Sequence, residues 1–229
     1  MRWGKKSSDQ TSVAMFAVSY SLLSLLAFAL NRNLLHLVLL WNDFLALIPL
    51  WLANRFESAL RRRSAAAILF VFLWLIFFPN APYMLTDFIH LQNVSFYSVS
   101  PYLPAVYSRQ LSVWIGLIQM GIGVLVGIAS GMFSLYIVHR ALTRRFESQR
   151  AALLLMPVFL LSGYAMYIGR FLRLNSWDVF RPQLLFAAIL RPTFFSLVMA
   201  ILFGWFILSA YWLFLILLTR LRDDSGRKI

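Results

Sequence analysis

The sequence predicts an all-α fold, an integral membrane helical bundle with about six transmembrane helices, and three observations lead to this class. Hydrophobic residues make up 61% of the 229 residues and the mean hydropathy is +0.76, whereas soluble domains are about 45–50% apolar. The apolar residues gather in six runs of roughly the length that about 30 Å of hydrocarbon requires. Basic residues separate these runs. We therefore expect residues 1–229 to form a single polytopic membrane domain.

The six runs follow one another along the chain. They are Val13–Leu30, Leu34–Ala53, Ala65–Phe78, Leu111–Val138, Ala151–Gly169 and Thr193–Leu218. The first run could alternatively be a signal peptide, because Arg2, Lys5 and Lys6 precede it and Ala27-Phe28-Ala29 resembles a cleavage site. Its apolar core is longer than the usual stretch of about 7–15 residues, which favours an uncleaved helix.

The distribution of basic residues predicts the orientation of the helices. If the N-terminus is cytoplasmic, the cytoplasmic segments hold 15 of the 21 Lys and Arg residues. Because Lys and Arg concentrate in cytoplasmic loops, both termini are expected on the cytoplasmic side. The net charge of +13 therefore reflects topology and not nucleic-acid binding, which needs a soluble basic face for phosphate contacts. The absence of cysteine excludes disulfides, thiolate metal sites and Cys nucleophiles.

The third run is short and ends in a proline motif. From Arg63 to Asn80 a helix rises about 25 Å, less than the roughly 30 Å it must cross. Pro79 and Pro82 then oppose a regular helix, so we expect non-helical backbone at Pro79–Pro82. Such backbone is tolerated only where it is buried in protein or lines a wet cavity, and broken helices often mark binding sites in transporters. The sequence therefore predicts a polar pocket on the extracytoplasmic side.

The first polar motif runs from Asn80 through Tyr83 and Asp87 to His90. Asp87 and His90 are three residues apart and share a face on a helix. A carboxylate beside an imidazole can act as a general base, or the pair can supply two metal ligands. The alternative is an interfacial cap and a surface histidine. Asn80 and Tyr83 are candidates for orienting a substrate.

The second polar motif follows the fifth run. Arg170 and Arg173 are expected to share a helical face, where two guanidiniums can hold a phosphate or carboxylate. Alternatively they pair with Asp87 and Asp178 to fasten helices, or extend towards lipid phosphates.

The remainder of this motif, Asn175-Ser176-Trp177-Asp178, offers a helix cap, an interfacial indole and a carboxylate. Ser176 could instead join His90 and an aspartate, Asp87 or Asp178, in a catalytic triad. No Gly-x-Ser-x-Gly motif surrounds it.

Asp43 is the most deeply placed acid. It lies about 13 Å along the second helix, near mid-membrane, where an ionisable group is a functional-site hypothesis. The alternative is a carboxyl that fixes helix packing. His36 and His139, near helix ends, are interpreted as ordinary interface residues.

Three further segments have structural interpretations. Gly123, Gly127 and Gly131 form a small-residue ridge for close helix contact, which could also bind a partner protein. Phe96–Tyr107 is expected to be an interfacial aromatic loop. The apolar stretch Gln183–Leu190 is too short to span and is expected to lie in the interface or re-enter.

The pattern Phe-Pro-Asn-Ala-Pro-Tyr-x-x-Thr-Asp-x-x-His-Leu, followed by Gly-Arg-Phe-x-Arg-x-Asn-Ser-Trp-Asp, resembles a bacterial membrane family known as domain of unknown function 1361. Trp41-Asn42-Asp43 also resembles its second-helix pattern. The resemblance implies a multi-pass protein of a bacterial cytoplasmic membrane and supports the choice of residues. It implies no substrate.

These observations lead to two functional hypotheses, with the cofactor and metal dependence left open. In the first, the protein is an enzyme for a lipid or lipid-linked substrate with an anionic head group, in which Asp87, His90 and Asp178 carry chemistry. The substrate would contact the remaining candidates, which are Asn80, Tyr83, Arg170, Arg173, Asn175 and Trp177. In the second, it is a non-enzymatic transport or binding subunit, or a partner in a larger membrane complex, in which Asp43 couples transport to an ion gradient.

Overall fold

The structure, a computed structural model, describes residues 5–226 except 93, 101–102, 175–177, 179–180, 182, 184–185 and 187–191. The described part contains six helical segments long and apolar enough to cross a membrane, as the sequence predicts. They are Ser12–Asn31, Leu35–Arg61, Ala66–Leu91, Leu111–Thr143, Ser148–Phe171 and Phe194–Leu221. The chain is therefore a multi-pass membrane protein. The short stretch Gln183–Leu190 lies largely outside the described residues.

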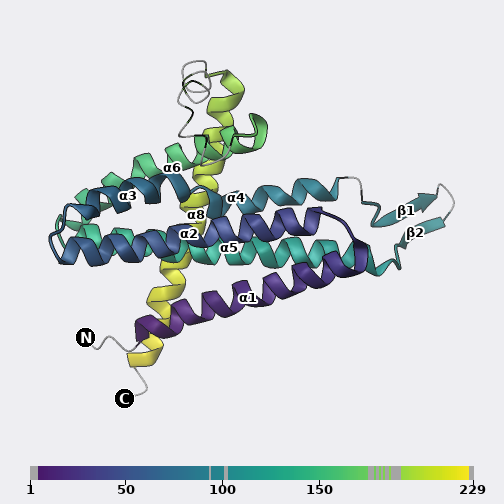
Figure 1. The fold of residues 1–229 in the computed structure, drawn as a ribbon, viewed down its shortest axis with the longest axis horizontal. Helices are drawn as coiled ribbons and strands as arrows, with labels where there is room; N and C mark the ends of the chain where they lie inside the picture. The colour runs from purple at the N-terminus through teal and green to yellow at the C-terminus, as the bar shows by residue number, and fades with distance from the viewer. Residues whose placement is uncertain are drawn as a thin grey trace.

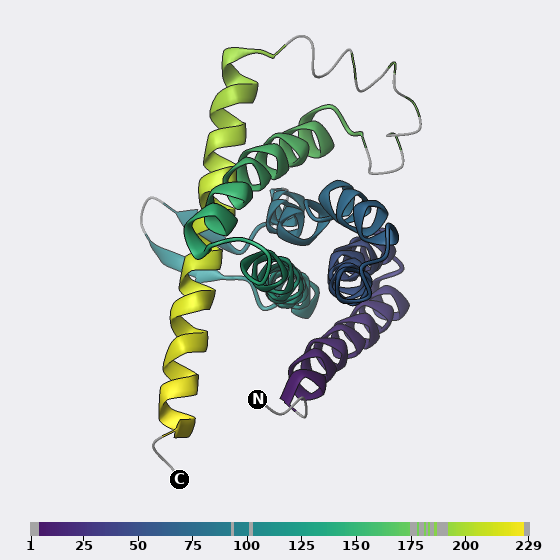
Figure 2. The ribbon, with the colours of Figure 1, turned by 90° about the vertical axis from the view of Figure 1, so that its left-hand side faces the viewer.

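The centre of the bundle is formed by α2 (Leu35–Arg61) and α5 (Leu111–Thr143), which lie side by side (Figure 1). Helix α1 (Lys5–Asn31) packs obliquely against both, and α3 (Ala66–Phe77) packs against α2. Helix α6 (Ser148–Phe171) pairs mainly with α8 (Phe194–Gly226). Viewed end-on, α8 lies on the opposite side of α5 from α2 and crosses the long axis of the bundle steeply (Figure 2).

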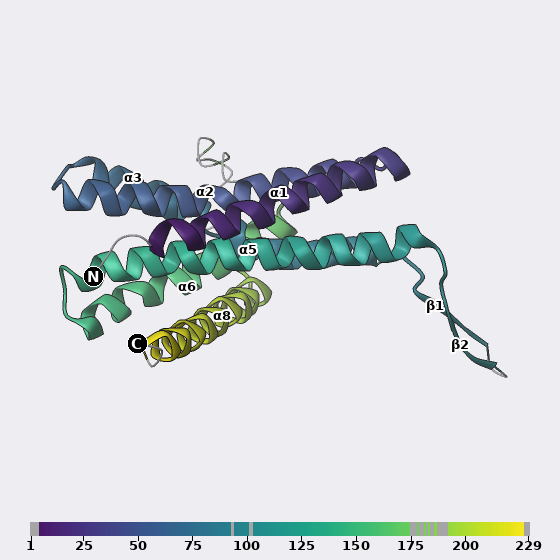
Figure 3. The ribbon, with the colours of Figure 1, turned by 90° about the horizontal axis from the view of Figure 1, so that it is seen from below.

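The two ends of the bundle differ in chemistry. At one end, here named the hairpin end, the α1–α2 loop meets the beginning of α5, and an antiparallel hairpin of β1 (Tyr97–Ser100) and β2 (Leu103–Tyr107) projects beyond the helices (Figure 3). At the other, the arginine end, the α2–α3 and α5–α6 loops meet. The segment predicted as an interfacial aromatic loop contains this hairpin, because aromatic and β-branched residues favour paired strands.

The third span is broken after α3, but its proline motif is helical and not irregular as predicted. A short helix α4 (Asn80–Tyr83) and a 3₁₀ helix η1 (Met84–Leu91) continue the span. Pro79 keeps right-handed helical dihedrals, and the Ala81 N–H donates to the Phe78 carbonyl three residues back. A proline nitrogen carries no hydrogen and cannot donate a helical hydrogen bond. The 3₁₀ bonds thus satisfy carbonyls that would otherwise lack a donor.

The glycine ridge of α5 contacts helices of the same chain. Gly123 faces the Tyr20 ring of α1, and Gly127 faces the Ala81 carbonyl and Met84. Gly131 faces the Ala81 side chain. The predicted close helix contact is therefore present within the chain, where it seats α4 and η1 against α5. A partner protein on this face stays a prediction.

Large apolar side chains cover much of the outer surface, as expected for helices solvated by lipid. Phe194, Trp205 and Trp212 of α8 are each at least two-thirds exposed. The interior packs around Trp74, Phe78 and Leu135, which are fully buried. This interior brings the polar motif after α3 against α2, α5 and α6.

Candidate functional site

Asp87 is a buried carboxylate held by two other helices. The 3₁₀ helix η1 turns its side chain inward, and the residue is 2% exposed. Arg170 of α6 donates through Nη2 to Asp87 Oδ1 at 2.9 Å, and Asn42 of α2 donates through Nδ2 to Oδ2 at 3.1 Å. Buried carboxylates need such partners. Of the alternatives drawn from the sequence, the pairing of Arg170 with Asp87 is present.

The Arg170 guanidinium is fixed on three sides. Its Nε donates to Thr86 Oγ1 at 3.0 Å, and the Thr86 hydroxyl donates to the Tyr83 carbonyl at 2.7 Å. The guanidinium carbon lies 4.7 Å from the centre of the Tyr83 ring, within the range of a cation–π contact. Tyr83 and Thr86 therefore position Arg170 on Asp87.

The expected shared helical face of Arg170 and Arg173 is wrong. Helix α6 ends at Phe171, and Arg173 has a left-handed backbone with φ of 58°. The Leu174 N–H returns to the Ile168 carbonyl, six residues back, and a left-handed residue such as Arg173 ends many helices. Arg173 is consequently exposed and directed independently of Arg170.

The remaining residues of the two motifs are only partly brought together. Asn80 donates to the Phe77 carbonyl at 2.9 Å and so caps the broken end of α3. Asp178 is buried, with one oxygen 3.9 Å from Arg181. Asn175, Ser176 and Trp177 lie outside the described residues.

His90 lines a cavity of about 380 Å³ at the hairpin end, together with His36. The two histidines come from η1 and from the first turn of α2. Both carboxamide and aliphatic side chains line the cavity, so it has polar and apolar walls. The lining also includes Asn31, Asn33, Leu35, Leu91, Val94, Ser112, Val113, Gly116, Gln119 and Met120.

A hydrogen-bonded chain fixes His36. Its Nδ1 lies 2.6 Å from Gln119 Oε1, and Gln119 Nε2 donates to Ser24 Oγ at 2.9 Å. Because the Gln119 oxygen can only accept, Nδ1 carries the proton. The other ring nitrogen, Nε2, faces the Asn31 amide at 3.4 Å. The interpretation of His36 as an ordinary interface residue is therefore wrong: it is buried in a specific network.

Asp43 lies apart from both groups. It is 2% exposed and its Oδ1 has no hydrogen-bond partner. It lines a second cavity of about 400 Å³ with Ser21, Trp41 and Phe44, and it is close enough to interact electrostatically with the Tyr20 hydroxyl. Two adjacent residues of α2 thus belong to different sites: Asn42 donates to Asp87, and Asp43 lines this second cavity.

Sequence reasoning did not identify Asn42, Thr86 and Gln119 as parts of these sites. Thr86 directly precedes Asp87 in the first polar motif, so its position could have identified it as part of the site. Gln119 is a single amide in an apolar helix, and no sequence motif marks it. Within the described residues, no group of three or more His, Asp or Glu side chains is arranged to hold a metal ion.

Comparison with known proteins gives a family. No curated protein and no solved structure matches the chain. A family model described as "Protein of unknown function (DUF1361)" matches residues 41–211, which include Asn42, the whole of α3 to η1 and Arg170. Since the match extends over well more than half of the sequence, the chain belongs to the DUF1361 family.

Proposed function

We propose that this protein is a membrane enzyme that acts on a lipid or lipid-linked substrate with an anionic head group, bound at the hairpin end. The observation that carries the proposal is the convergence of His36 and His90 on one cavity with mixed polar and apolar walls. Ligand sites typically combine apolar walls with a few placed polar groups. In this proposal the protein resides in a bacterial cytoplasmic membrane, with both termini in the cytoplasm and the hairpin end outside.

His90 is the proposed proton acceptor. Imidazole exchanges protons near neutral pH, which makes histidine a common general base. Asp87 precedes His90 by three residues on the same 3₁₀ helix, and Arg170 and Asn42 hold Asp87 in place. Asp87 and Arg170 are therefore positioning residues for η1, and Tyr83 and Asn80 support the same segment.

Arg173 is the proposed contact for the anionic head group. Its left-handed backbone is a conformation that costs an L-residue about 1–2 kcal/mol and that glycine adopts freely. The Arg173 side chain is exposed, so its guanidinium can donate hydrogen bonds to an anionic head group. Arg63 has the same conformation, φ of 54°, at the arginine end, and provides a matched control.

The test compares the wild type with Arg173→Gly and Arg63→Gly, each purified from native membrane. Both substitutions relieve the same backbone cost and should keep the fold, so loss of a ligand cannot be attributed to unfolding. Mass spectrometry should find a specific anionic species with the wild type and Arg63→Gly, and at least tenfold less, roughly 1.4 kcal/mol, with Arg173→Gly. The same bulk lipids in all three proteins would reject the proposal.

The chemical step has a separate test in cells. A His90→Asn strain should lose a lipid or lipoprotein modification present in the wild type, while protein accumulation is unchanged. If the His90→Asn and Asp87→Asn strains both have the same lipid and lipoprotein profiles as the wild type, the enzymatic function is rejected and only ligand binding is left.

A second candidate function, transport coupled to an ion gradient, is favoured by Asp43. Its carboxyl is buried within a span and has an oxygen without a partner. Such groups often belong to proton or ion pathways. The sequence has no Gly-x-x-x-x-Gly-Lys-Ser/Thr motif for ATP, so the energy would come from a gradient or another chain.

Carbodiimide labelling tests this candidate, because the reagent modifies protonated carboxyls in apolar surroundings. Peptide mapping should find the label on Asp43 and not on Asp87, which is ion-paired with Arg170. In vesicles, Asp43→Asn should abolish coupled uptake but not ligand binding. Equal uptake by the wild type and Asp43→Asn would reject a coupling role.

A further inference from the structure

Glu57 gathers three arginines at the arginine end. Its Oε1 accepts hydrogen bonds from Arg61 Nη2 at 2.8 Å, Arg140 Nη2 at 2.7 Å and Arg144 Nη1 at 3.0 Å. Arg61 lies one turn further along α2, Arg140 lies in the last turn of α5, and Arg144 directly follows that helix. We name these four residues the arginine cluster. The Glu57 side chain is 2% exposed, whereas the arginine side chains are 35%, 31% and 48% exposed.

The cluster has more positive than negative charge. Three guanidiniums around one carboxylate leave a formal net charge of +2. Arg140 also has a buried Nε with no hydrogen-bond partner, and its guanidinium lies 5.7 Å from the centre of the Tyr136 ring. One carboxylate offsets only part of the repulsion among three guanidiniums held this closely. The four residues of the cluster therefore have a formal excess of positive charge, and the buried Arg140 Nε lacks an acceptor.

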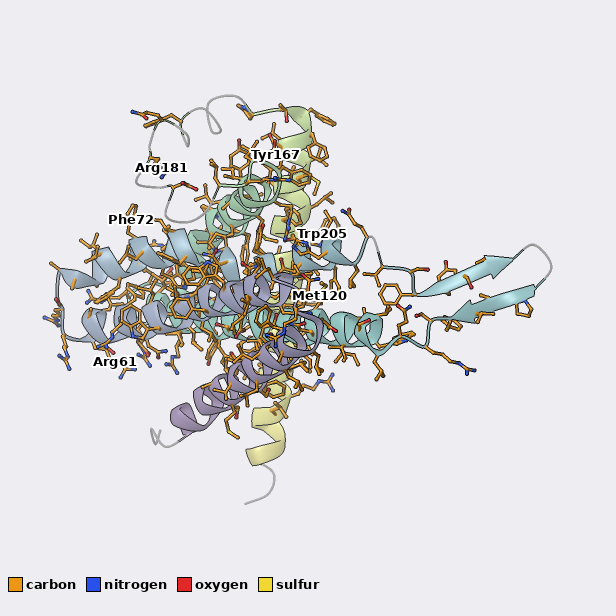
Figure 4. All side chains as sticks on the ribbon, turned by 45° about the vertical axis from the view of Figure 1, so that its right-hand side comes forward. Arg61, Phe72, Met120, Tyr167, Arg181 and Trp205 are labelled. Atoms are coloured by element: carbon orange, nitrogen blue, oxygen red, sulfur yellow. The ribbon has the colours of Figure 1, made fainter. Side chains whose placement is uncertain are left out.

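The cluster lies at the level where lipid head groups are expected. The spans Leu35–Arg61 and Leu111–Thr143 end here, and Figure 4 shows Arg61 at one end of the bundle. Basic residues at helix C-termini are ordinary, because the helix dipole and the topology both favour them. Neither effect explains why a buried carboxylate brings three guanidiniums to a single oxygen.

We propose that the arginine cluster binds the phosphate of an anionic phospholipid head group. Guanidinium groups present planar sets of donors that match phosphate oxygens, and basic sites between membrane helices bind anionic head groups. Arg144, the most exposed of the three, and Arg140 would donate to the phosphate while Glu57 holds them in place. This site lies at the opposite end of the bundle from the proposed substrate cavity.

The test measures phosphatidylglycerol preference in nanodiscs of phosphatidylcholine with and without phosphatidylglycerol. Native mass spectrometry counts the bound lipid, and thermal unfolding reports stabilisation. Arg144→Gln should lower the preference at least fivefold, about 1 kcal/mol, the effect of one basic residue near an anionic surface. Arg150→Gln removes the same charge at the same end, from an exposed pair with Glu147 at 3.8 Å, and should leave the preference within about twofold.

Glu57→Gln should raise the preference for phosphatidylglycerol, the opposite of the effect expected for Arg144→Gln. It raises the formal charge of the cluster from +2 to +3, so the variant should unfold at a lower temperature in phosphatidylcholine and regain stability with phosphatidylglycerol. Equal lipid preference in the wild type and Arg144→Gln would overturn the proposal, as would equal losses in Arg144→Gln and Arg150→Gln. Protection by inorganic phosphate in detergent as strong as that by the lipid would overturn the assignment to a lipid.

Discussion

Arg170 of α6 and Asp87 of η1 form a buried ion pair, with Nη2 and Oδ1 2.9 Å apart across 83 residues of sequence. The Asp87 side chain is 3% exposed and the Arg170 side chain 15%. Because both side chains are largely shielded from water, the pair fixes the position of the 3₁₀ helix relative to α6. It thereby fixes the backbone that carries His90.

Removal of either partner should destabilise the protein. Asp87→Asn and Arg170→Gln each leave one buried charge uncompensated, which typically lowers the free energy of unfolding by about 3–5 kcal/mol. The double variant should lose clearly less than the sum of the two, because neither charge is then stranded. Reversible unfolding in detergent measures the cycle, and Arg173→Gln, at an exposed position, is the control. Additive losses in the double variant would show that the two residues are not coupled.

A methyl group at Gly127 should disturb the seat of η1. A Cβ at this position would meet the Ala81 carbonyl and lie 3.0 Å from the Met84 sulfur. Since the carbonyl belongs to the backbone, Gly127→Ala should lower the free energy of unfolding by about 1–3 kcal/mol. Gly121→Ala, with nothing within 4 Å of the added carbon, should leave stability unchanged. Equal stability of both variants would mean that α4 and η1 can move away from α5 at no cost.

Gln119 should matter for stability although it is a single amide in an apolar helix. Gln119→Leu removes the acceptor for His36 Nδ1 and the donor to Ser24, so two buried groups lose partners at a cost of about 1–3 kcal/mol each. Gln110→Leu, at the exposed residue before α5, is the matched control. Thermal unfolding in one detergent gives the comparison, and a Gln119→Leu protein as stable as Gln110→Leu would contradict the network.

Two of the buried aspartates, Asp43 and Asp87, should respond differently to the same substitution. Asp43→Asn replaces a carboxyl whose Oδ1 has no partner, so the free energy of unfolding should change by no more than about 1 kcal/mol. Asp87→Asn should cost several times more, as argued above. Parallel unfolding of the two single variants decides the matter. A loss with Asp43→Asn as large as with Asp87→Asn would show that Asp43 is structural.

The sequence determined the features that depend on local composition. Apolar length determined the six spans, Pro79 and Pro82 determined the break in the third, and the spacing of Gly123, Gly127 and Gly131 determined a face for close contact. These features follow from hydrophobicity, backbone geometry and residue size within one segment. Family membership also follows from the sequence, because the family model matches residues 41–211.

Only the tertiary structure decided which polar groups meet. The rotation and neighbours of each helix placed Arg170 on Asp87, His36 beside His90 in one cavity, and Arg140 on Glu57. The sequence pattern put Arg170 and Arg173 on one face, but α6 ends at Phe171 and separates them. Hydropathy identifies what can enter the membrane, whereas partners are selected by the packing of helices that are distant in sequence.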